Sequence, residues 1–451
     1  MNDYKRLFQP QAVAVIGASS NPEKLGGVVM NNLIHGNFSG EIFPVNPKGG
    51  LIFDRQVYSN IEALPENIDL AILALDAKLS VNAIQNLGKK HIPFAIIFAG
   101  GYAEIGNHEL EEELKKACIA SNILLIGPNC MGLFNGNHNL NASFMNILPP
   151  ILGKVSLVSQ SGSLIAVAIY EKLRMGKFVS IGNAITISFQ ELLPFLASDP
   201  ETAVIALYIE SLKDGRKFLE IIQTISKPVI ALRAGQSEAG QRSIASHTAS
   251  LATNVALTNS LFKAANIIQV SSFEMLTSVS RAFELMKVPK NNKVIALSNA
   301  GGAVCLFSDA CAEFGLETCP LPSELVEKLQ KIFPPQAPIN NPLDLTVTGW
   351  QAETVKKILN VFMEDSYDYG TIVFMPVVAP YQSAEDDAKI AIEYAKKYPL
   401  PFMTCLLSGD KVRPVIPLLD SQNIAYCTTI RETAEVLGQM VSWQRNRQTK
   451  N

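Results

Sequence analysis

The stretch Ala12-Val13-Ala14-Val15-Ile16-Gly17-Ala18-Ser19-Ser20 decides the fold of this chain. Its unbroken apolar run predicts a strand that is buried on both faces, as in parallel sheets covered by helices. The small residues after the run predict a turn that leads into a helix. The same order of strand, small-residue turn and helix restarts at 154–162 and again at 293–302, so the chain repeats one design three times.

The repeated design predicts an α/β protein built from three doubly wound parallel-sheet units, each Rossmann-like or flavodoxin-like. Further apolar runs predict buried strands at 70–75, 94–98, 202–208 and 228–232. The break Leu148-Pro149-Pro150 and the polar stretch Pro289-Lys290-Asn291-Asn292 are typical of domain junctions. We therefore expect three domains, at residues 1–145, 150–287 and 290–451.

The composition is that of a globular protein with large cores. Of the 451 residues, 48% are hydrophobic and 18% are charged, and the formal net charge is −3. This balance argues against nucleic acid as a partner, which would favour a basic surface. No apolar stretch approaches the ~20 residues of a membrane-spanning helix, and the first residues lack the apolar core of a signal peptide. We therefore expect a cytoplasmic protein without membrane contact.

The seven cysteines are odd in number and lack the companions of a metal site. Cys305, Cys311 and Cys319 lie close together in the sequence, but none of the five histidines is near them. Zinc sites combine cysteines and histidines at short, regular spacings. We expect reduced thiols and no metal bound by this chain.

The strand and glycine turn of the first unit are typical of a nucleotide-binding site, but the glycine spacing and the residues after the second strand disfavour NAD. Glycines fall at 17, 26 and 27, so the G-x-G-x-x-G spacing is missing. An NAD site also needs an acidic residue after the second strand, where this chain has Asn46-Pro47-Lys48. An amide and a lysine suit a phosphorylated ribose, as in coenzyme A or NADP.

Four motifs in this unit carry a family resemblance: Gly17-Ala18-Ser19, Val45-Asn46-Pro47-Lys48, Ala99-Gly100-Gly101-Tyr102-Ala103-Glu104 and Gly127-Pro128-Asn129-Cys130-Met131-Gly132. In this order they resemble the coenzyme A-binding domain of the ADP-forming (NDP-forming) acyl-CoA synthetases, relatives of the succinyl-CoA ligase α subunit. The resemblance implies that CoA or acyl-CoA is bound at Gly17, Ala18, Ser19, Asn46, Pro47, Lys48, Ala74, Ala99, Gly100 and Asn129.

The second unit resembles the same family's ligase domain. Val158-Ser159-Gln160-Ser161-Gly162-Ser163-Leu164 is similar to its phosphate-binding helix start, so phosphate is expected at Ser159, Gln160, Ser161 and Gly162. Ser180-Ile181-Gly182-Asn183 resembles a turn of that domain. Glu210, at the end of the run Tyr208-Ile209-Glu210-Ser211, stands where the family has a glutamate that orients the catalytic imidazole.

That imidazole would belong to His247. The segment Ser246-His247-Thr248-Ala249-Ser250-Leu251 follows the glycine-bearing run Arg233–Gly240 and resembles the family's phosphohistidine motif. We expect His247 in a small-residue loop at the start of a helix, where backbone N–H groups stabilise an anion. The resemblance implies that His247 carries a phosphoryl group and that Glu210 fixes its tautomer.

The implied reaction converts acyl-CoA, ADP and phosphate into a carboxylic acid, ATP and CoA through phospho-His247. No segment of this chain remains for an ATP-grasp module. The resemblance therefore implies an α subunit that needs a separate ATP-grasp β subunit, most simply as α2β2, with ADP, ATP and Mg²⁺ bound only through that partner. The acyl group stays open, with acetate the simplest choice.

Six residues depart from the family pattern. Glycines are replaced at two positions, later acids at two, and the aspartates after Asn183 at two: Ala249, Thr253, Val255, Asn259, Thr186 and Ser188. These changes leave His247 and Glu210 in place, but they could stiffen the loop or alter the acyl pocket.

The third unit also carries motifs that resemble the same family. Ser298-Asn299-Ala300-Gly301-Gly302, Asp309 and Asn341-Pro342-Leu343-Asp344-Leu345-Thr346 resemble the family's third module, which serves packing and partner contact. One alternative is a non-catalytic CoA- or acyl-CoA-binding protein with a degenerate phosphotransfer loop. The other is an NADP-dependent oxidoreductase, which leaves the His247 segment unexplained.

Overall fold

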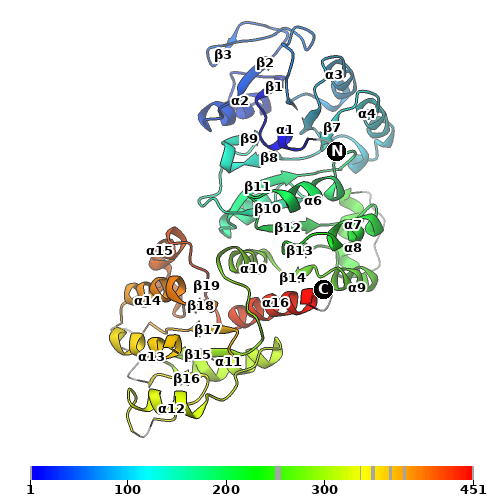
Figure 1. Ribbon diagram of the computed structural model, residues 1–451. Helices are drawn as coiled ribbons and strands as arrows, with labels where there is room; N and C mark the ends of the chain where they lie inside the picture. The colour runs from blue at the N-terminus through cyan, green and yellow to red at the C-terminus, as the bar shows by residue number, and fades with distance from the viewer. Residues whose placement is uncertain are drawn as a thin grey trace. The chain divides into compact units, whose positions relative to one another are not determined.

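The computed structural model describes residues 3–248, 255–335, 337–346, 351–364, 368–378 and 382–448. Contacts divide the chain into two compact units, Met1–Leu276 and Thr277–Asn451. The first unit holds two large sheets and the second holds one (Figure 1). The expected α/β class with parallel sheets is confirmed.

The first sheet is parallel throughout, in the order β2-β1-β5-β6-β7. Its strands are β1 (Ala12–Ile16), β2 (Glu41–Val45), β5 (Leu70–Leu73), β6 (Phe94–Ile97) and β7 (Leu124–Ile126). All residues of β1, β5 and β6 are buried, which is why these runs carry no polar alternation. The remaining elements are α1 (Lys5–Phe8), α2 (Leu25–His35), β3 (Leu51–Ile52), β4 (Arg55–Gln56), α3 (Ala77–Lys89), η1 (Ala103–Ile105) and α4 (His108–Ala120).

The second sheet has the order β14-β13-β12-β10-β11-β8-β9. Its strands are β8 (Gly132–Asn135), β9 (Leu140–Ser143), β10 (Val155–Ser159), β11 (Met175–Ser180), β12 (Val204–Ile209), β13 (Val229–Arg233) and β14 (Ile268–Val270). The hairpin of β8 and β9 joins β11 in antiparallel fashion, whereas β10 to β14 are parallel. The other elements are η2 (Gly136–His138), α5 (Ile165–Tyr170), α6 (Phe189–Ser198), α7 (Gly215–Gln223), α8 (Glu238–Thr248), α9 (Val255–Ala264) and α10 (Phe273–Leu285).

The third sheet is parallel, in the order β16-β15-β17-β18-β19. Its strands are β15 (Val294–Ser298), β16 (Leu343–Asp344), β17 (Thr371–Phe374), β18 (Phe402–Cys405) and β19 (Tyr426–Cys427). Its helices are α11 (Gly301–Glu313), α12 (Ser323–Gln330), α13 (Ala352–Glu364), α14 (Ala384–Lys397), η4 (Gly409–Lys411), η5 (Arg413–Val415), α15 (Ile416–Ser421) and α16 (Ile430–Gln448). Helix α16 packs along α11.

The seven cysteines are free thiols. Over the described ranges, no three acidic, histidine or cysteine side chains gather as a metal site would require. None of the helices in those ranges has the length and apolar character needed to cross a membrane.

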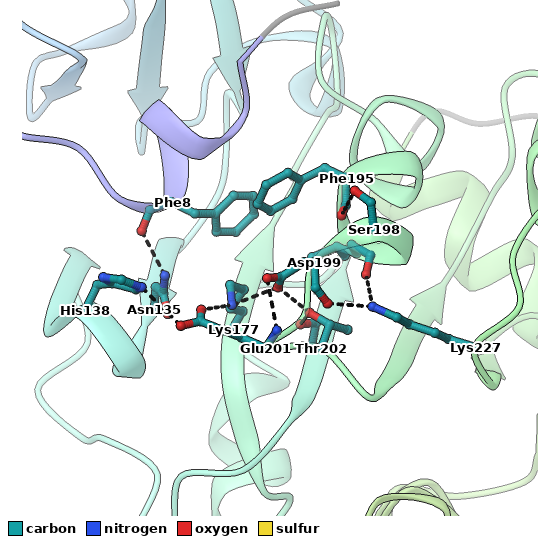
Figure 2. Close-up of polar contacts among 12 residues, drawn as sticks. Phe8, Asn135, His138, Lys177, Phe195, Ser198, Asp199, Glu201, Thr202 and Lys227 are labelled. Atoms are coloured by element: carbon teal, nitrogen blue, oxygen red, sulfur yellow. Dashed lines mark hydrogen bonds and ion pairs between the residues drawn. The ribbon is translucent and has the colours of Figure 1, made fainter.

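A buried ion cluster braces the second sheet (Figure 2). Lys177 on β11 is 1% exposed, and its Nζ lies 2.9 Å from Asp199 Oδ2 and 2.6 Å from Glu201 Oε2. Thr202 Oγ1 donates to the same Asp199 oxygen at 2.6 Å. Burial works against the charge of Asp199, but the hydrogen bonds from Thr202 and Lys177 outweigh it and lower its pKa. Burial likewise opposes the charge of Glu201, and Lys177 again lowers the pKa.

The same region ties the N-terminal helix to the second sheet. Phe8 of α1 stacks on Phe195 of α6, with ring centroids 4.8 Å apart, and its carbonyl oxygen accepts a hydrogen bond from Asn135 Nδ2 at 2.9 Å (Figure 2). His138 Nε2 lies 3.2 Å from Glu201 Oε1, which links the hairpin to the ion cluster. The ion cluster therefore supports the contact between α1 and the second sheet as well as strand β11.

We expect Lys177→Met to lower the free energy of unfolding by about 3 to 5 kcal/mol, because two carboxylates lose their buried counter-charge. Urea titration followed by circular dichroism measures the change. The loss should be present above the ordinary carboxyl pKa and shrink as pH falls, because the lowered pKa values of Asp199 and Glu201 stabilise the fold only while both are ionised. Arg216→Ala, at an exposed pair with Glu220, is the control and should cost less than about 1 kcal/mol. Equal losses in both variants would contradict this account.

Candidate functional site

The first cluster of expected CoA-binding residues forms where β1, β2 and β5 end. The backbone N–H groups of Gly17 and Ala18 both donate to Val45 O, at 3.0 and 3.1 Å. Asn46 Nδ2 donates to Ala18 O at 2.9 Å, so the amide that follows β2 closes the turn that follows β1. The N–H of Ala74 donates to Ile16 O at 2.9 Å, so the turn after β5 joins the same edge.

The outer rim of this turn is polar and accessible. Ser19 Oγ accepts from Asn21 N at 3.0 Å, and Asn46 Oδ1 accepts from Lys48 N at 3.0 Å. Pro47 and Lys48 are exposed. The turn therefore offers the exposed cation of Lys48 at the carboxyl edge of the sheet, the place where open α/β sheets bind ligands.

Gly17 is required by both its conformation and its surroundings. It has φ +86°, and a Cβ built there would lie 2.5 Å from Ala74 O. A Cβ on Gly26, in the first turn of α2, would lie 2.0 Å from Gly17 O. The glycines at 17 and 26 thus let α2 start directly against the turn, without the dinucleotide spacing.

A second loop pair lies at the ends of β6 and β7. The N–H of Asn129 donates to Ala99 O at 2.9 Å, which places these two expected CoA contacts beside each other. Glu104 Oε1 accepts hydrogen bonds from the backbone N–H groups of Gly101 and Tyr102, so the carboxylate folds the loop after Gly100 back on itself.

Asn183 connects this loop pair to the second sheet. Its Nδ2 donates to Glu104 Oε2 and to Glu111 Oε2, both at 2.7 Å, and its Oδ1 accepts from Asn129 Nδ2 at 3.3 Å. Burial raises the pKa of Glu104, but the hydrogen bonds from Asn183 and the loop N–H groups outweigh it and lower the pKa overall. Lys213 Nζ donates to Asn183 O at 2.8 Å, and burial lowers the pKa of Lys213.

Two departures from the family pattern have structural roles. Thr186 Oγ1 accepts from Leu125 N at 2.7 Å, so it bonds the edge strand β7. Ser188 is the N-cap of α6, with its side chain accepting from Gln190 N and its N–H donating to Glu191. The Thr186 hydroxyl therefore joins the two sheets, whereas the Ser188 hydroxyl caps α6.

The expected phosphate loop follows β10. Ser159 Oγ donates to Ser161 O at 2.6 Å, and a Cβ on Gly162 would lie 2.2 Å from Met131 Cγ. Helix α5 begins only at Ile165 and has six residues. The helix thus starts just after the motif Val158–Leu164.

Gln160 positions the turn that carries Glu210. Its Oε1 accepts from the N–H groups of Glu210 at 2.6 Å and Ser211 at 3.0 Å. The side-chain oxygen is therefore used to hold the ends of β10 and β12 together. Glu210 itself is half-buried. The burial of Tyr208, together with the negative charge of the nearby Glu210, raises the pKa of Tyr208 to about 12.

His247 is the second-last residue of helix α8, so its expected place at a helix start is wrong. The helix begins earlier because Ser237 caps it: Ser237 Oγ accepts from Gly240 N at 3.1 Å. The signal was in the sequence, as a serine before an acidic residue. The His247 side chain lies outside the described residues, as do Ala249 and Thr253. The backbone of α8 lies beside η1, next to the Gly100 loop.

This correction changes the electrostatic argument for an anion on His247. His247 lies in the last described turn of α8, far from Glu238, so the N–H groups at the N-terminus of this helix do not stabilise an anion on His247. Positive charge or N–H donors from other elements must supply the stabilisation.

Sequence reasoning missed Arg233, the last residue of β13. It is 6% exposed, and it lies in register with Ile209, the residue before Glu210. Its Nη1 donates to Asn259 Oδ1 at 3.3 Å. A polar residue at the carboxyl end of a buried strand was the available signal.

Three family models match the chain: a CoA binding domain at residues 11–136, a succinyl-CoA ligase like flavodoxin domain at 152–283 and a Ligase-CoA domain at 294–450. The chain is 35% identical to the ADP-forming acetate–CoA ligase II subunit alpha of Pyrococcus furiosus, over 81% of this chain and 80% of that protein. It is 37% identical to the ADP-forming acetate–CoA ligase of Methanocaldococcus jannaschii, over 76% of this chain and 49% of that protein. It therefore spans about half the length of the latter.

A solved structure agrees over nearly the whole chain. The dinucleotide forming acetyl-coenzyme A synthetase 1 of Ca. Korarchaeum cryptofilum, in complex with phosphate and ADP, superposes with a TM-score of 0.93 at 29% identity, covering 99% of this chain and 98% of that one. The chain belongs to the family of ADP-forming acyl-CoA synthetases. The family and fold inferred from the sequence are confirmed.

We expect Gly17→Ala to lower the free energy of unfolding by about 2 to 5 kcal/mol, from the left-handed backbone and the contact with the Ala74 carbonyl together. Gly106→Ala is the matched control, because Gly106 has the same φ of +86° and an added Cβ would meet nothing within 4 Å. It should cost only the conformational part, about 1 to 2 kcal/mol. Urea titration compares the two, and equal costs would refute the close approach.

We expect Asn183→Asp to destabilise the first unit by about 1 to 3 kcal/mol, because a donor that serves two carboxylates becomes a third carboxylate. The penalty should shrink as pH falls and the carboxylates take up protons. Thermal unfolding from pH 4 to 8 measures it. Asn86→Asp, at a half-buried position of α3 where Lys89 Nζ donates to Asn86 Oδ1 at 2.9 Å, adds the same charge beside a cation and should change stability by less than about 0.5 kcal/mol. A pH-independent loss at Asn183 would contradict the hydrogen-bond network.

Proposed function

We propose that the chain is the α subunit of an NDP-forming acyl-CoA synthetase, which interconverts acyl-CoA, ADP and phosphate with a carboxylic acid, ATP and CoA. The observation that carries the proposal is the bond from Gln160 to the Glu210 turn, which brings the expected phosphate loop and the expected imidazole partner together. The family membership, and the phosphate and ADP in the structural neighbour, support it.

We assign CoA to the edge formed by the turns after β1, β2 and β5 and the loop pair at Ala99 and Asn129. Gly17 lets backbone approach closely, and Lys48 offers a charge for a phosphate of CoA. The functional domains proposed are 1–145, 150–287 and 290–451, and the three family-model ranges support this division.

The proposed chemistry has three transfers. A phosphate oxygen attacks the thioester carbonyl, the C–S bond breaks, and CoA leaves as a thiolate that takes up a proton. His247 then attacks the phosphorus of the acyl phosphate, and the P–O bond to the carboxylate breaks. Finally the phosphoryl group passes from His247 to the terminal phosphate of ADP. Glu210 holds the other imidazole nitrogen, and Ser159, Ser161 and Gly162 receive the phosphate.

The last transfer calls for a partner. The relatives named as alpha subunits support a second subunit, and we propose an ATP-grasp β chain that binds ADP and Mg²⁺ in an α2β2 assembly. The free thiols support a cytoplasmic location.

Labelled phosphate tests the proposal. With a panel of acyl-CoA thioesters, the purified chain should take up acid-labile, base-stable label, and His247→Ala should abolish it. Glu210→Gln should slow labelling by about 10²-fold or more, because the imidazole loses its charged partner. His108→Ala, at an exposed histidine that begins α4, is the control and should label normally. A chain that binds CoA but takes up no label, even with an ATP-grasp partner added, would sink the proposal and favour a CoA-binding protein.

A further inference from the structure

Arg233 is a buried cation that lacks a counter-charge among the residues that the structure describes. It is 6% exposed, and no carboxylate in the part of the chain that the structure describes forms an ion pair with it. Its hydrogen bond goes to the neutral side chain of Asn259. Burying a charge without a counter-charge is costly, so buried arginines are normally paired with acids or with ligands.

The hydrogen-bond partner of Arg233 carries no charge. Asn259 lies on α9, and its side chain is a neutral amide. An acid at this position would form an ion pair with Arg233, whereas the amide accepts a hydrogen bond and leaves the positive charge in place. Burial lowers the pKa of Arg233, which reflects the same cost.

The position of Arg233 places this charge at the functional edge of the second sheet. Arg233 ends β13 in register with Ile209 of β12, and Ala234 N donates to Ile209 O at 2.9 Å. Glu210 follows directly in the chain. Helix α8, which carries His247, begins five residues after Arg233, and His247 lies far from the N–H groups of its N-terminus. The cation is thus supplied by the strand that leads into that helix.

We propose that Arg233 binds a phosphate oxyanion at the carboxyl ends of β12 and β13, and that Asn259 keeps its charge available. A guanidinium suits this ligand because its planar N–H fork matches two oxygens of a phosphate. This inference rests on the proposed function and adds to it a residue for the group that is transferred. It also gives the Asn259 departure a role, since an aspartate there would compete with the ligand.

Asn259→Asp separates ligand binding from a purely structural role. The variant keeps the contact with Arg233 and adds a counter-charge, so a structural anchor would be preserved or strengthened. Phosphate binding would instead weaken, by at least tenfold on our proposal. Ser260→Asp adds the same charge at an exposed position of the same helix and is the matched control. Arg233→Met removes the charge, and Arg233→Lys keeps it without the fork.

The measurement is binding of inorganic phosphate to the full chain, by calorimetry and by the rise in Tm at constant ionic strength. We expect phosphate affinity to fall at least tenfold in Asn259→Asp and Arg233→Met, less in Arg233→Lys, and to stay unchanged in Ser260→Asp. CoA affinity should be the same in all five proteins. Equal phosphate affinity in Asn259→Asp and the unchanged chain would overturn the proposal, as would an equal loss in Ser260→Asp.

The binding assay does not require catalysis, so the two proposals fail separately. Absence of phosphate labelling in the unchanged chain, even with an ATP-grasp partner added, together with intact Arg233-dependent phosphate binding, would refute the synthetase mechanism alone. Normal labelling, with phosphate affinity insensitive to Arg233 and Asn259, would refute the oxyanion role alone.

Discussion

The side-chain amide of Asn183 is the contact on which the arrangement of the first unit depends. One N–H₂ group serves the carboxylates of Glu104 and Glu111, and the amide oxygen receives Asn129. Through these bonds a turn of the second sheet fixes two loops of the first. Lys213 extends the network toward the turn of Glu210. The expected CoA and phosphate loops therefore share one framework of hydrogen bonds.

Parallel sheets explain why the residues of this framework are far apart in the sequence. Each strand delivers its turn to the same edge, and several polar side chains there bond to the neighbouring turn. Gln160 does so across β10 and β12, and Asn46 across β1 and β2. The site is thus assembled from short connections whose positions are set by strand register.

The sequence predicted the three-fold repetition of strand, turn and helix because fully buried strands leave unbroken apolar runs, as at Ala12–Ile16. It also predicted the family, because small residues and prolines mark the turns directly. It failed for His247, because a single N-cap at Ser237 moved the helix start by several residues. Arg233 escaped notice because burial and the identity of a distant partner, Asn259, are tertiary properties.

The hairpin of β8 and β9 has a consequence for dividing the chain into pieces. These strands precede the proline-rich break at 148–150, yet they form the edge of the sheet that lies beyond it. If the chain were cut at that break, the N-terminal piece would carry β8 and β9, which belong to the sheet of the C-terminal piece. In the C-terminal piece β11 would become an unpaired edge strand beside the Lys177 cluster, open to pairing with a strand of another molecule. The first two sheets are consequently best expressed, mutated and exchanged between relatives as one piece.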